Sequence, residues 1–230
     1  MFKTYLNPDE IEQLENAAEN FRDKLLIHTL SRTGSRISEV LGIVAEDIDF
    51  TQGTLTIQHL RVRTNLLCPK CGARLGKSHV FCPKCGVEVE RPLALEDEHG
   101  RQRIIPIDKE TLDLFKEYIE GGGPVLKKGK KVIFGINRHR AWQIVTECAR
   151  RANLPQLINP ETGRIHNPSP HRIRDSFAVN AVKQDDSGDG LRMLQEYLGH
   201  DSFNTTSKYR KVAGEELRSW YDKLWSKDKP

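Results

Sequence analysis

Residues 169–183 read SPHRIRDSFAVNAVK. A serine followed by a proline is typical of a helix start, because serine caps free backbone N–H groups and proline fits the first helical position. In the predicted helix, His171 and Arg174 lie three residues apart, on one face near the positive end. Such a pair can bind phosphate, although pairs of this kind are also common on ordinary helix surfaces.

Two other segments place cationic and phenolic side chains at predicted helix ends. Arg36 follows Thr33-Gly34-Ser35 and begins a short helix, and His200 follows the helix-ending pair Leu198-Gly199. Tyr209 comes nine residues after His200. Taken singly, each has an ordinary structural interpretation: a surface cation, a helix cap and a packed aromatic ring.

The periodicity of the chain predicts a mostly helical α+β domain with one small antiparallel sheet. The first helix begins at Asn7-Pro8-Asp9-Glu10, which combines a capping residue, a proline and a glutamate three positions on. The other expected helices cover residues 21–30, 35–41, 109–119, 138–152, 169–183, 191–198, 205–211 and 214–226, with a loop over 184–190.

The strand pattern is interrupted. Ile48 and Phe50, then Leu55 and Ile57, alternate with polar residues as in a hairpin, and a short strand is expected at 131–134. The next β-rich run, at 104–107, is the expected delayed partner strand. Residues 63–95 are therefore predicted to be an insert within one domain that spans 1–230, since loops tolerate insertions.

The insert carries a repeated cysteine motif. CPKCG occurs at 68–72 and again at 82–86, with ten residues between the two pairs. Two such turns offer four thiolates to one tetrahedral Zn²⁺, so Cys68, Cys71, Cys82 and Cys85 are the predicted ligands. Four thiolates close the coordination sphere, which predicts a structural metal. Disulfides or free thiols are the alternatives, and the fifth cysteine, Cys148, is expected to fill the core.

Composition limits the class of protein. The chain has 230 residues, 37% of them hydrophobic and 30% charged, which suits one folded domain. Because it has neither a long apolar run nor a signal-like start, we expect a cytoplasmic protein without a membrane partner. Residues 61–92 hold seven basic and two acidic side chains, and their local charge of +5 exceeds the +4 of the whole chain. This distribution suits contact with a phosphate backbone, although it is also compatible with a solvated surface.

Together, TGSRISEVLG, PHRIRDSFA and LQEYLGHDSFNTTSKY resemble, in order and spacing, the three signature boxes of the tyrosine recombinases, the phage integrase and Xer family. The segments YLNPDEIEQL, DIDF and RIIPI extend the resemblance over nearly the whole chain outside the cysteine insert. It implies that the chain has the fold of a tyrosine recombinase catalytic domain. Its implied site residues are Arg36, His171, Arg174 and His200 around the scissile phosphate, Tyr209 as the nucleophile, and Glu39 bracing the first box.

The residue types suit this chemistry. Two guanidinium groups can hold the charge that develops on a phosphodiester under attack. Tyrosine has an ordinary pKa near 10 and needs nearby cations to react as a phenolate. The product would be a 3′-phosphotyrosyl link that keeps the bond energy of the phosphodiester. Neither ATP nor a catalytic metal is therefore expected.

The sequence departs from the family in two places. Family members usually carry a lysine at a hairpin turn, and here the insert divides that region. The flanks offer only Arg61, Arg63, His99, Arg101 and Arg103, so either an arginine acts electrostatically or a ribbon lysine such as Lys77 replaces it. The family also generally has an N-terminal clamp domain, and this chain begins where the catalytic domain should begin.

The resemblance also implies partners. Double-stranded DNA is the expected substrate, with a homotetramer on DNA, a monomer in solution and a nucleoid-associated location. The predicted final helix would pack either within the subunit or into a neighbour. Two other functions stay open: a type IB topoisomerase-like nicking-closing enzyme, and a zinc-ribbon DNA-binding protein with weak or lost catalysis.

Overall fold

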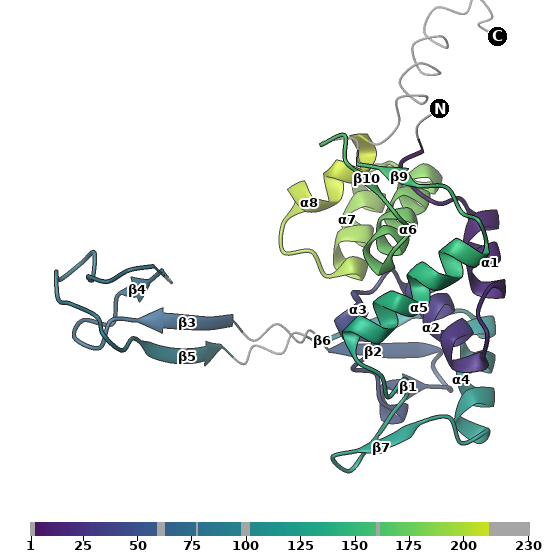
Figure 1. The fold of residues 1–230 in the computed structure, drawn as a ribbon, viewed down its shortest axis with the longest axis horizontal. Helices are drawn as coiled ribbons and strands as arrows, with labels where there is room; N and C mark the ends of the chain where they lie inside the picture. The colour runs from purple at the N-terminus through teal and green to yellow at the C-terminus, as the bar shows by residue number, and fades with distance from the viewer. Residues whose placement is uncertain (1–2, 59–62, 77, 98–101, 160–161, 212–230) are drawn as a thin grey trace, which may run out of the picture. The chain divides into compact units, whose positions relative to one another are not determined.

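The structure, a computed structural model, describes residues 3–58, 63–76, 78–97, 102–159 and 162–211. Its contacts divide the chain into two compact units. The first, here called the body, combines residues 1–57 with 103–230, and the second, the ribbon unit, comprises 58–102. The body is mixed helix and small antiparallel sheet, as predicted (Figure 1).

The helices of the body begin and end close to the predicted signals. Asn7 and Glu10 form a capping box at the first helix, and the second ends at Gly34, which has a left-handed conformation. The α-helices are α1 (Pro8–Asn16), α2 (Phe21–Thr33), α3 (Ile37–Val40), α4 (Lys109–Glu120), α5 (Arg138–Arg151), α6 (Pro170–Gln184), α7 (Gly188–Leu198) and α8 (Phe203–Ser207), and two 3-10 helices are η1 (Ala45–Asp47) and η2 (Lys208–Lys211).

Apolar side chains from these helices form two clusters of buried residues. The larger cluster includes Leu26 and Leu30 of α2, Phe115 of α4 and Cys148 of α5. Cys148 therefore fills the core, as predicted. The smaller cluster joins α6 to α7, which lie side by side (Figure 1). Helix α6 also packs against α2 and η2. Helix α6 thus connects the core to the C-terminal segment of the described chain.

The sheet of the body contains strands that precede and follow the ribbon unit in the sequence. Its order is β1 (Ile48–Asp49), β2 (Thr54–Gln58) and β6 (Gln102–Pro106). Strands β1 and β2 pair antiparallel, with Ile48 opposite Leu55. The prediction that the run at 104–107 supplies the delayed partner strand is confirmed, because β6 neighbours β2 in this sheet.

Several predicted boundaries were wrong. The strand expected at 131–134 is the second half of a hairpin, β7 (Val125–Lys127) and β8 (Lys130–Val132), and the pair β9 (Leu157–Ile158) and β10 (Ile165–His166) was not predicted. Strands β7, β8 and β10 are largely exposed, and β9 has only two residues, so no alternating apolar pattern marks them. The loop expected over 184–190 is shorter, because Ser187 caps α7 from Gly188 onward. The helix predicted at 214–226 lies outside the described residues.

The ribbon unit has its own three-stranded sheet. The strand order is β4 (Arg74–Leu75), β3 (Arg63–Leu67) and β5 (Leu93–Asp97), with Leu67 of β3 opposite both Arg74 and Leu93. Among the described residues of this unit, the buried cluster consists of Cys68, Leu75, Cys82 and Val89. The unit is therefore built around its cysteines and has very little apolar core.

Candidate active site and metal centre

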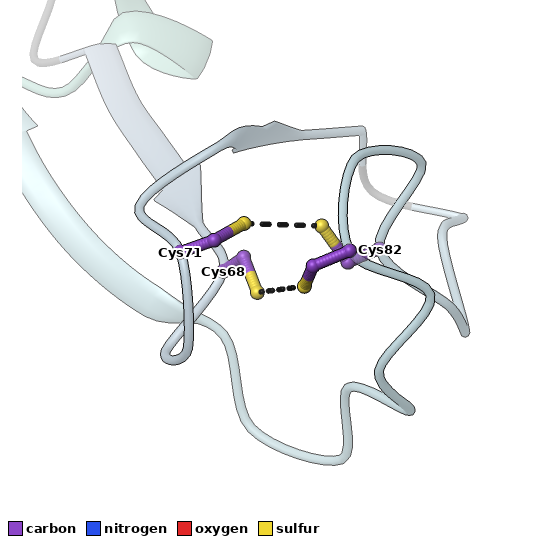
Figure 2. Close-up of side chains that lie close together, drawn as sticks. Cys68, Cys71 and Cys82 are labelled. Carbon is purple, nitrogen blue, oxygen red and sulfur yellow. Dashed lines mark hydrogen bonds between the residues drawn. The ribbon is translucent and has the colours of Figure 1, made fainter.

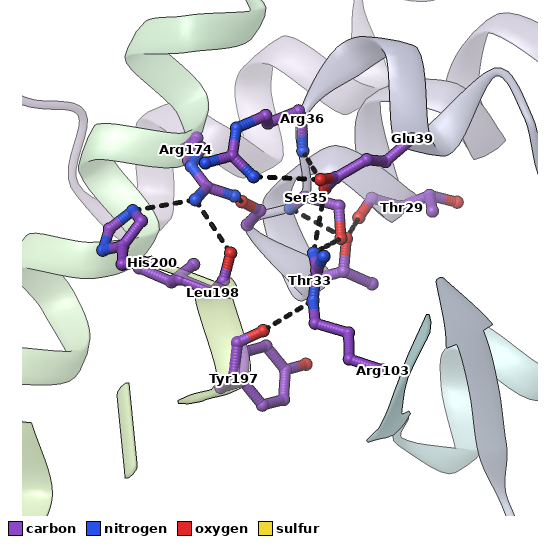
Figure 3. Close-up of polar contacts among 11 residues, drawn as sticks. Thr29, Thr33, Ser35, Arg36, Glu39, Arg103, Arg174, Tyr197, Leu198 and His200 are labelled. Carbon is purple, nitrogen blue, oxygen red and sulfur yellow. Dashed lines mark hydrogen bonds and ion pairs between the residues drawn. The ribbon is translucent and has the colours of Figure 1, made fainter. Parts of the chain in front are cut away.

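Three arginines, Arg36, Arg103 and Arg174, form an arginine cluster on the body (Figure 3). Glu39 of α3 holds two of them: its carboxylate accepts from Arg36 Nη1 at 3.0 Å and from Arg103 Nη2 at 2.9 Å. The same carboxylate accepts from the backbone N–H of Arg36 at 2.9 Å, which fixes the start of α3. Glu39 is only 2% exposed, so its charge acts on these cations with little screening by water.

Arg174 links α6 to the turn at Gly34 and to the segment that follows α7. Its guanidinium donates to the carbonyl oxygens of Gly34, at 2.6 Å, and Leu198, at 3.0 Å. It also donates to His200 Nε2 at 2.8 Å. Arg174 is 4% exposed, and burial, together with repulsion from Arg36, lowers its pKa to about 10. Its contacts therefore fix the side chain, which still carries its charge at neutral pH.

His200 is held as a neutral imidazole. Its Nε2 accepts the Arg174 N–H, so the ring proton lies on Nδ1, which is 2.9 Å from Thr206 Oγ1. Burial and the positive charges of the arginine cluster lower its pKa to about 4. At neutral pH the ring therefore keeps Arg174 in place without adding a charge of its own.

Gly34 allows the first segment to approach α6. The residue has a positive φ of 55°, and a Cβ atom there would lie 2.5 Å from a ring carbon of Phe177 and 3.0 Å from Leu198. Only glycine fits both the conformation and the space. The prediction that Gly34 ends the helix is confirmed, and the same residue brings Arg36 beside Arg174.

Tyr209 of η2 lies at the edge of this site. Its ring stacks near that of His200, with 6.2 Å between centroids. Its hydroxyl donates to Asp175 Oδ1 at 3.1 Å. Burial and the Asp175 carboxylate raise the pKa of the phenol, whereas Arg174 and Arg36 act in the opposite direction. The phenol is therefore protonated in this structure, although it lies beside the cations.

His171 is placed differently from the other predicted residues. Its side chain is 71% exposed at the start of α6, and its nearest described charged partner is Asp175, with 3.9 Å between Nε2 and Oδ2. The structure thus brings together Arg36, Arg174, His200 and Tyr209, whereas His171 lies on the solvent side of the same helix.

Sequence reasoning left several site residues unassigned. Arg103 was named only as one cation flanking the insert, yet it donates to Tyr197 O at 2.9 Å as well as to Glu39. Asp175 and Thr206 were not named at all. A carboxylate next to Arg174 in the sequence could have suggested a role for Asp175. Among the alternatives for the hairpin lysine, Arg61, Lys77, His99 and Arg101 lie outside the described residues.

The four predicted metal ligands converge in the ribbon unit (Figure 2). The sulfur atoms of Cys68 and Cys85 are 3.7 Å apart, and those of Cys71 and Cys82 are 3.6 Å apart. A tetrahedral zinc with Zn–S bonds of about 2.3 Å requires sulfur separations of about 3.8 Å. The cysteine positions therefore fit a four-thiolate zinc site.

The two CPKCG turns have the same backbone. Gly72 and Gly86 each have a φ of 68°, and each donates to the carbonyl of the first cysteine of its motif at 2.9 Å. Burial raises the pKa of the Cys82 thiol, but N–H groups of Cys85 and Lys84 outweigh burial and lower it below its ordinary value. These N–H groups favour the thiolate of Cys82, the form that binds zinc.

A second group of metal-compatible side chains has another explanation. His28, Asp108 and Glu110 lie close together. However, His28 Nδ1 is 3.0 Å from Glu15, and its Nε2 is 3.0 Å from Thr111 Oγ1. Because both ring nitrogens have protein partners, we interpret His28 as a hydrogen-bonded core residue.

Comparison with known proteins gives two family matches. The sequence matches the phage integrase family over residues 4–70 and 90–216. Residues 67–88 match a zinc-ribbon domain, which together with the four cysteines indicates a structural zinc. Among the described residues, every helix is too short or too polar to cross a membrane.

Curated relatives include recombinases from bacteria and archaea. The chain is 26% identical to tyrosine recombinase XerD of Corynebacterium glutamicum over 206 residues, covering 86% of the chain and 51% of that protein. It is also 26% identical to tyrosine recombinase XerA of Pyrococcus horikoshii over 223 residues, covering 95% of the chain and 60% of that protein. The chain thus spans about half the length of the curated relatives it matches.

Solved structures share the fold. The XerA recombinase aligns with a TM-score of 0.64 and 17% identity over 99% of this chain and 65% of that one. XerH bound to palindromic difH substrate aligns with a TM-score of 0.62 and 20% identity, over 96% of this chain and 53% of that one. The Tn1549 transposon integrase with transposon right end DNA aligns with a TM-score of 0.59 and 18% identity, over 97% of this chain and 66% of that one.

Proposed function

The chain belongs to the phage integrase family, and from that premise we propose that it is a site-specific DNA recombinase whose nucleophile is Tyr209. In this proposal residues 1–230 form the catalytic domain, and 63–95 form its inserted zinc ribbon. The observation that carries the proposal is the convergence of Arg36, Arg174 and His200 at one site with Tyr209 beside them.

The arginine cluster suits a phosphodiester. Arg36 and Arg174 supply two guanidinium forks for the non-bridging oxygens, and Glu39 holds Arg36 in position. Hydrogen bonds from fixed guanidiniums are worth most where charge develops during reaction. His200 keeps the fork of Arg174 oriented, and His171 reaches the phosphate from the exposed side of α6. Asp175 lies beside Tyr209 and accepts a hydrogen bond from its hydroxyl.

Cleavage would form a bond between Tyr209 Oη and phosphorus and release the 5′-oxygen. The resulting 3′-phosphotyrosyl link keeps the energy of the broken bond, so a second 5′-hydroxyl can reverse the step without ATP. The arginines supply the charge stabilisation, and the chemistry proceeds without a catalytic metal. The zinc is structural, because its four thiolates leave no position open for water.

We also propose the partners of this activity. Double-stranded DNA is the substrate, in keeping with the DNA complexes solved for XerH and the Tn1549 integrase. The protein is a monomer in solution, assembles as a homotetramer on DNA, and works in the cytoplasm at the nucleoid.

A covalent capture experiment tests the nucleophile. The protein is incubated with a pool of nicked duplexes whose central sequence is random, so that a cleaved fragment is lost and the adduct accumulates. We expect a denaturant-resistant protein–DNA adduct from the wild type and none from Tyr209→Phe. An adduct from Tyr209→Phe would overturn the assignment. The absence of any adduct from the wild type would favour a zinc-ribbon DNA-binding protein.

Sequencing the captured DNA sharpens the result. A recombinase should enrich one core sequence, whereas a nicking-closing enzyme of the type IB kind should retain many sequences. The enriched duplex then becomes the substrate for kinetic measurements.

A further inference from the structure

We propose that Asp175 is a catalytic residue that accepts the phenolic proton of Tyr209 during DNA cleavage. The inference rests on the proposed function, because it needs Tyr209 to be the nucleophile. Its basis is direct contact: the Tyr209 hydroxyl donates to Asp175 Oδ1 at 3.1 Å. A general base has to lie within hydrogen-bond reach of the proton it removes, and this carboxylate does.

A third residue orients the carboxylate. Arg172 Nη1 donates to Asp175 Oδ2 at 2.8 Å, so one oxygen is held by the guanidinium while the other faces Tyr209. The side chains of Arg172 and Asp175 are 14% and 15% exposed, which limits their motion. A nucleophile, a base and a group that orients the base form the arrangement typical of an activated nucleophile.

The other nearby bases are placed less well. His200 uses Nε2 to accept from Arg174 and Nδ1 to contact Thr206, so its free electron pair is already engaged. His171 is 71% exposed and lies 3.9 Å from Asp175. Among the residues that the structure describes, Asp175 is the acceptor of the Tyr209 hydroxyl.

The state of the phenol explains why a base is needed. Burial and Asp175 raise the pKa of Tyr209, so a phenolate does not form in advance. The proton therefore has to leave while the bond to phosphorus forms. At that stage the phenolic oxygen becomes strongly acidic, and a carboxylate is basic enough to take its proton.

The Tyr209 oxygen forms a bond to phosphorus, and its proton moves to Asp175. The bond between phosphorus and the 5′-oxygen breaks, and that oxygen keeps the electron pair and takes a proton from water. In the reverse step a 5′-hydroxyl forms the bond to phosphorus and gives its proton to water, and Asp175 returns its proton to Tyr209 as the phosphotyrosyl bond breaks.

Single-turnover cleavage of the captured duplex tests the proposal. Asp175→Asn keeps the shape and a hydrogen-bond acceptor but removes the basic oxygen, so we expect cleavage at least about a hundredfold slower. Asp113→Asn, an exposed carboxylate on α4, is the matched control and should cleave at the wild-type rate. An unchanged or faster rate in Asp175→Asn would overturn the proposal, the faster rate indicating that Asp175 restrains Tyr209.

A second substrate separates the two proton transfers. In a strand with sulfur in place of the bridging 5′-oxygen, the leaving group is a thiolate, which needs no proton. If Asp175 acts on Tyr209, Asp175→Asn stays about a hundredfold slower on this substrate as well. Recovery of the wild-type rate on the sulfur substrate would place Asp175 on the leaving-group side and overturn the proposal.

Asp175→Glu shows whether slow cleavage by Asp175→Asn reflects the lost carboxylate or a misfolded protein. Asp175→Glu keeps a carboxylate and should cleave at least tenfold faster than Asp175→Asn, whereas equal rates would count against a base. The outcome is distinct from failure of the proposed function: if wild type forms no adduct, or Tyr209→Phe forms one, the nucleophile itself is wrong.

Discussion

The body and the ribbon unit are each stabilised by a different kind of core. In the body, more than twenty buried apolar side chains form the main cluster, with Phe115 and Leu26 among those fully buried. In the ribbon unit, two of the four buried members are cysteines. A domain of ordinary size can be stable through its apolar core, whereas so small a unit needs a metal or disulfides.

The difference extends to polar groups. In the body, buried charges such as Arg174 and Glu39 have several hydrogen-bond partners each. In the ribbon unit, the four thiols face one another. The first arrangement suits the proposed reaction, and the second suits permanent occupation by one ion.

The largest effect we expect comes from removing the metal. Chelation, or Cys82→Ser, should unfold the ribbon unit while the body stays folded, because zinc binding supplies on the order of 10 kcal/mol to such units. Hydrogen exchange measures this directly: protection at Gly72 and Gly86 should vanish, whereas protection within α2 should persist. Loss of both together would show that the units fold as one.

Truncating a core side chain of the body should destabilise the body and leave the ribbon unit intact. Phe115 is fully buried in the body, so Phe115→Ala should destabilise the body by about 3–5 kcal/mol, as measured by denaturant unfolding. The ribbon unit should keep its hydrogen-exchange protection. Phe81→Ala is the matched control in the ribbon unit, where Phe81 is 59% exposed, and its effect should stay within about 0.5 kcal/mol.

Acid should weaken the body through His200. The pKa of His200 is lowered from 6.5 to about 4, so below pH 6.5 the unfolded chain binds a proton that the folded body resists. Stability from this residue is therefore complete above pH 6.5 and is lost as pH falls towards 4, by up to about 3 kcal/mol. Unfolding measured across this range should depend less steeply on pH in His200→Gln; an equal slope would refute the assignment.

The smallest effect concerns the charge of the ribbon unit. Lys70 and Lys84 are exposed in the two CPKCG turns. If the ribbon contacts DNA, replacing both by glutamine should weaken binding about tenfold and reduce the salt slope by up to about 2. Replacing Lys109 and Lys116 on α4 makes the same charge change and serves as the control. An unchanged affinity and slope would leave the ribbon a stabilising role only.

Local signals predicted much of this structure. Asn7 with Glu10, Gly34, and the repeated CPKCG motif each act within a few residues, so caps, turns and metal ligands can be read from the sequence. The same holds for the delayed strand at 104–107, whose apolar residues needed a partner. Only one strand of the hairpin at 125–132 was predicted, because β7 is fully exposed, and β9 and β10 have two residues each, too few for an alternating pattern.

The site was harder to predict where its contacts are distant in sequence. Spacing placed His171 and Arg174 on one face, yet Arg174 turns inward to Gly34 and Leu198 while His171 stays exposed. The contact of Tyr209 with Asp175 joins residues 34 positions apart and depends on how η2 packs on α6. Helical periodicity carries no information on such packing.

The pairing of β2 with β6 has a kinetic consequence. An unfolded chain has to close a loop of more than forty residues to make this pairing, at an entropic cost about 2 kcal/mol above that of a short turn. Once β3 pairs with β5, from Arg63 opposite Asp97 to Leu67 opposite Leu93, most of that loop is already closed. We therefore expect zinc, by stabilising the ribbon unit, to speed the pairing of β2 with β6.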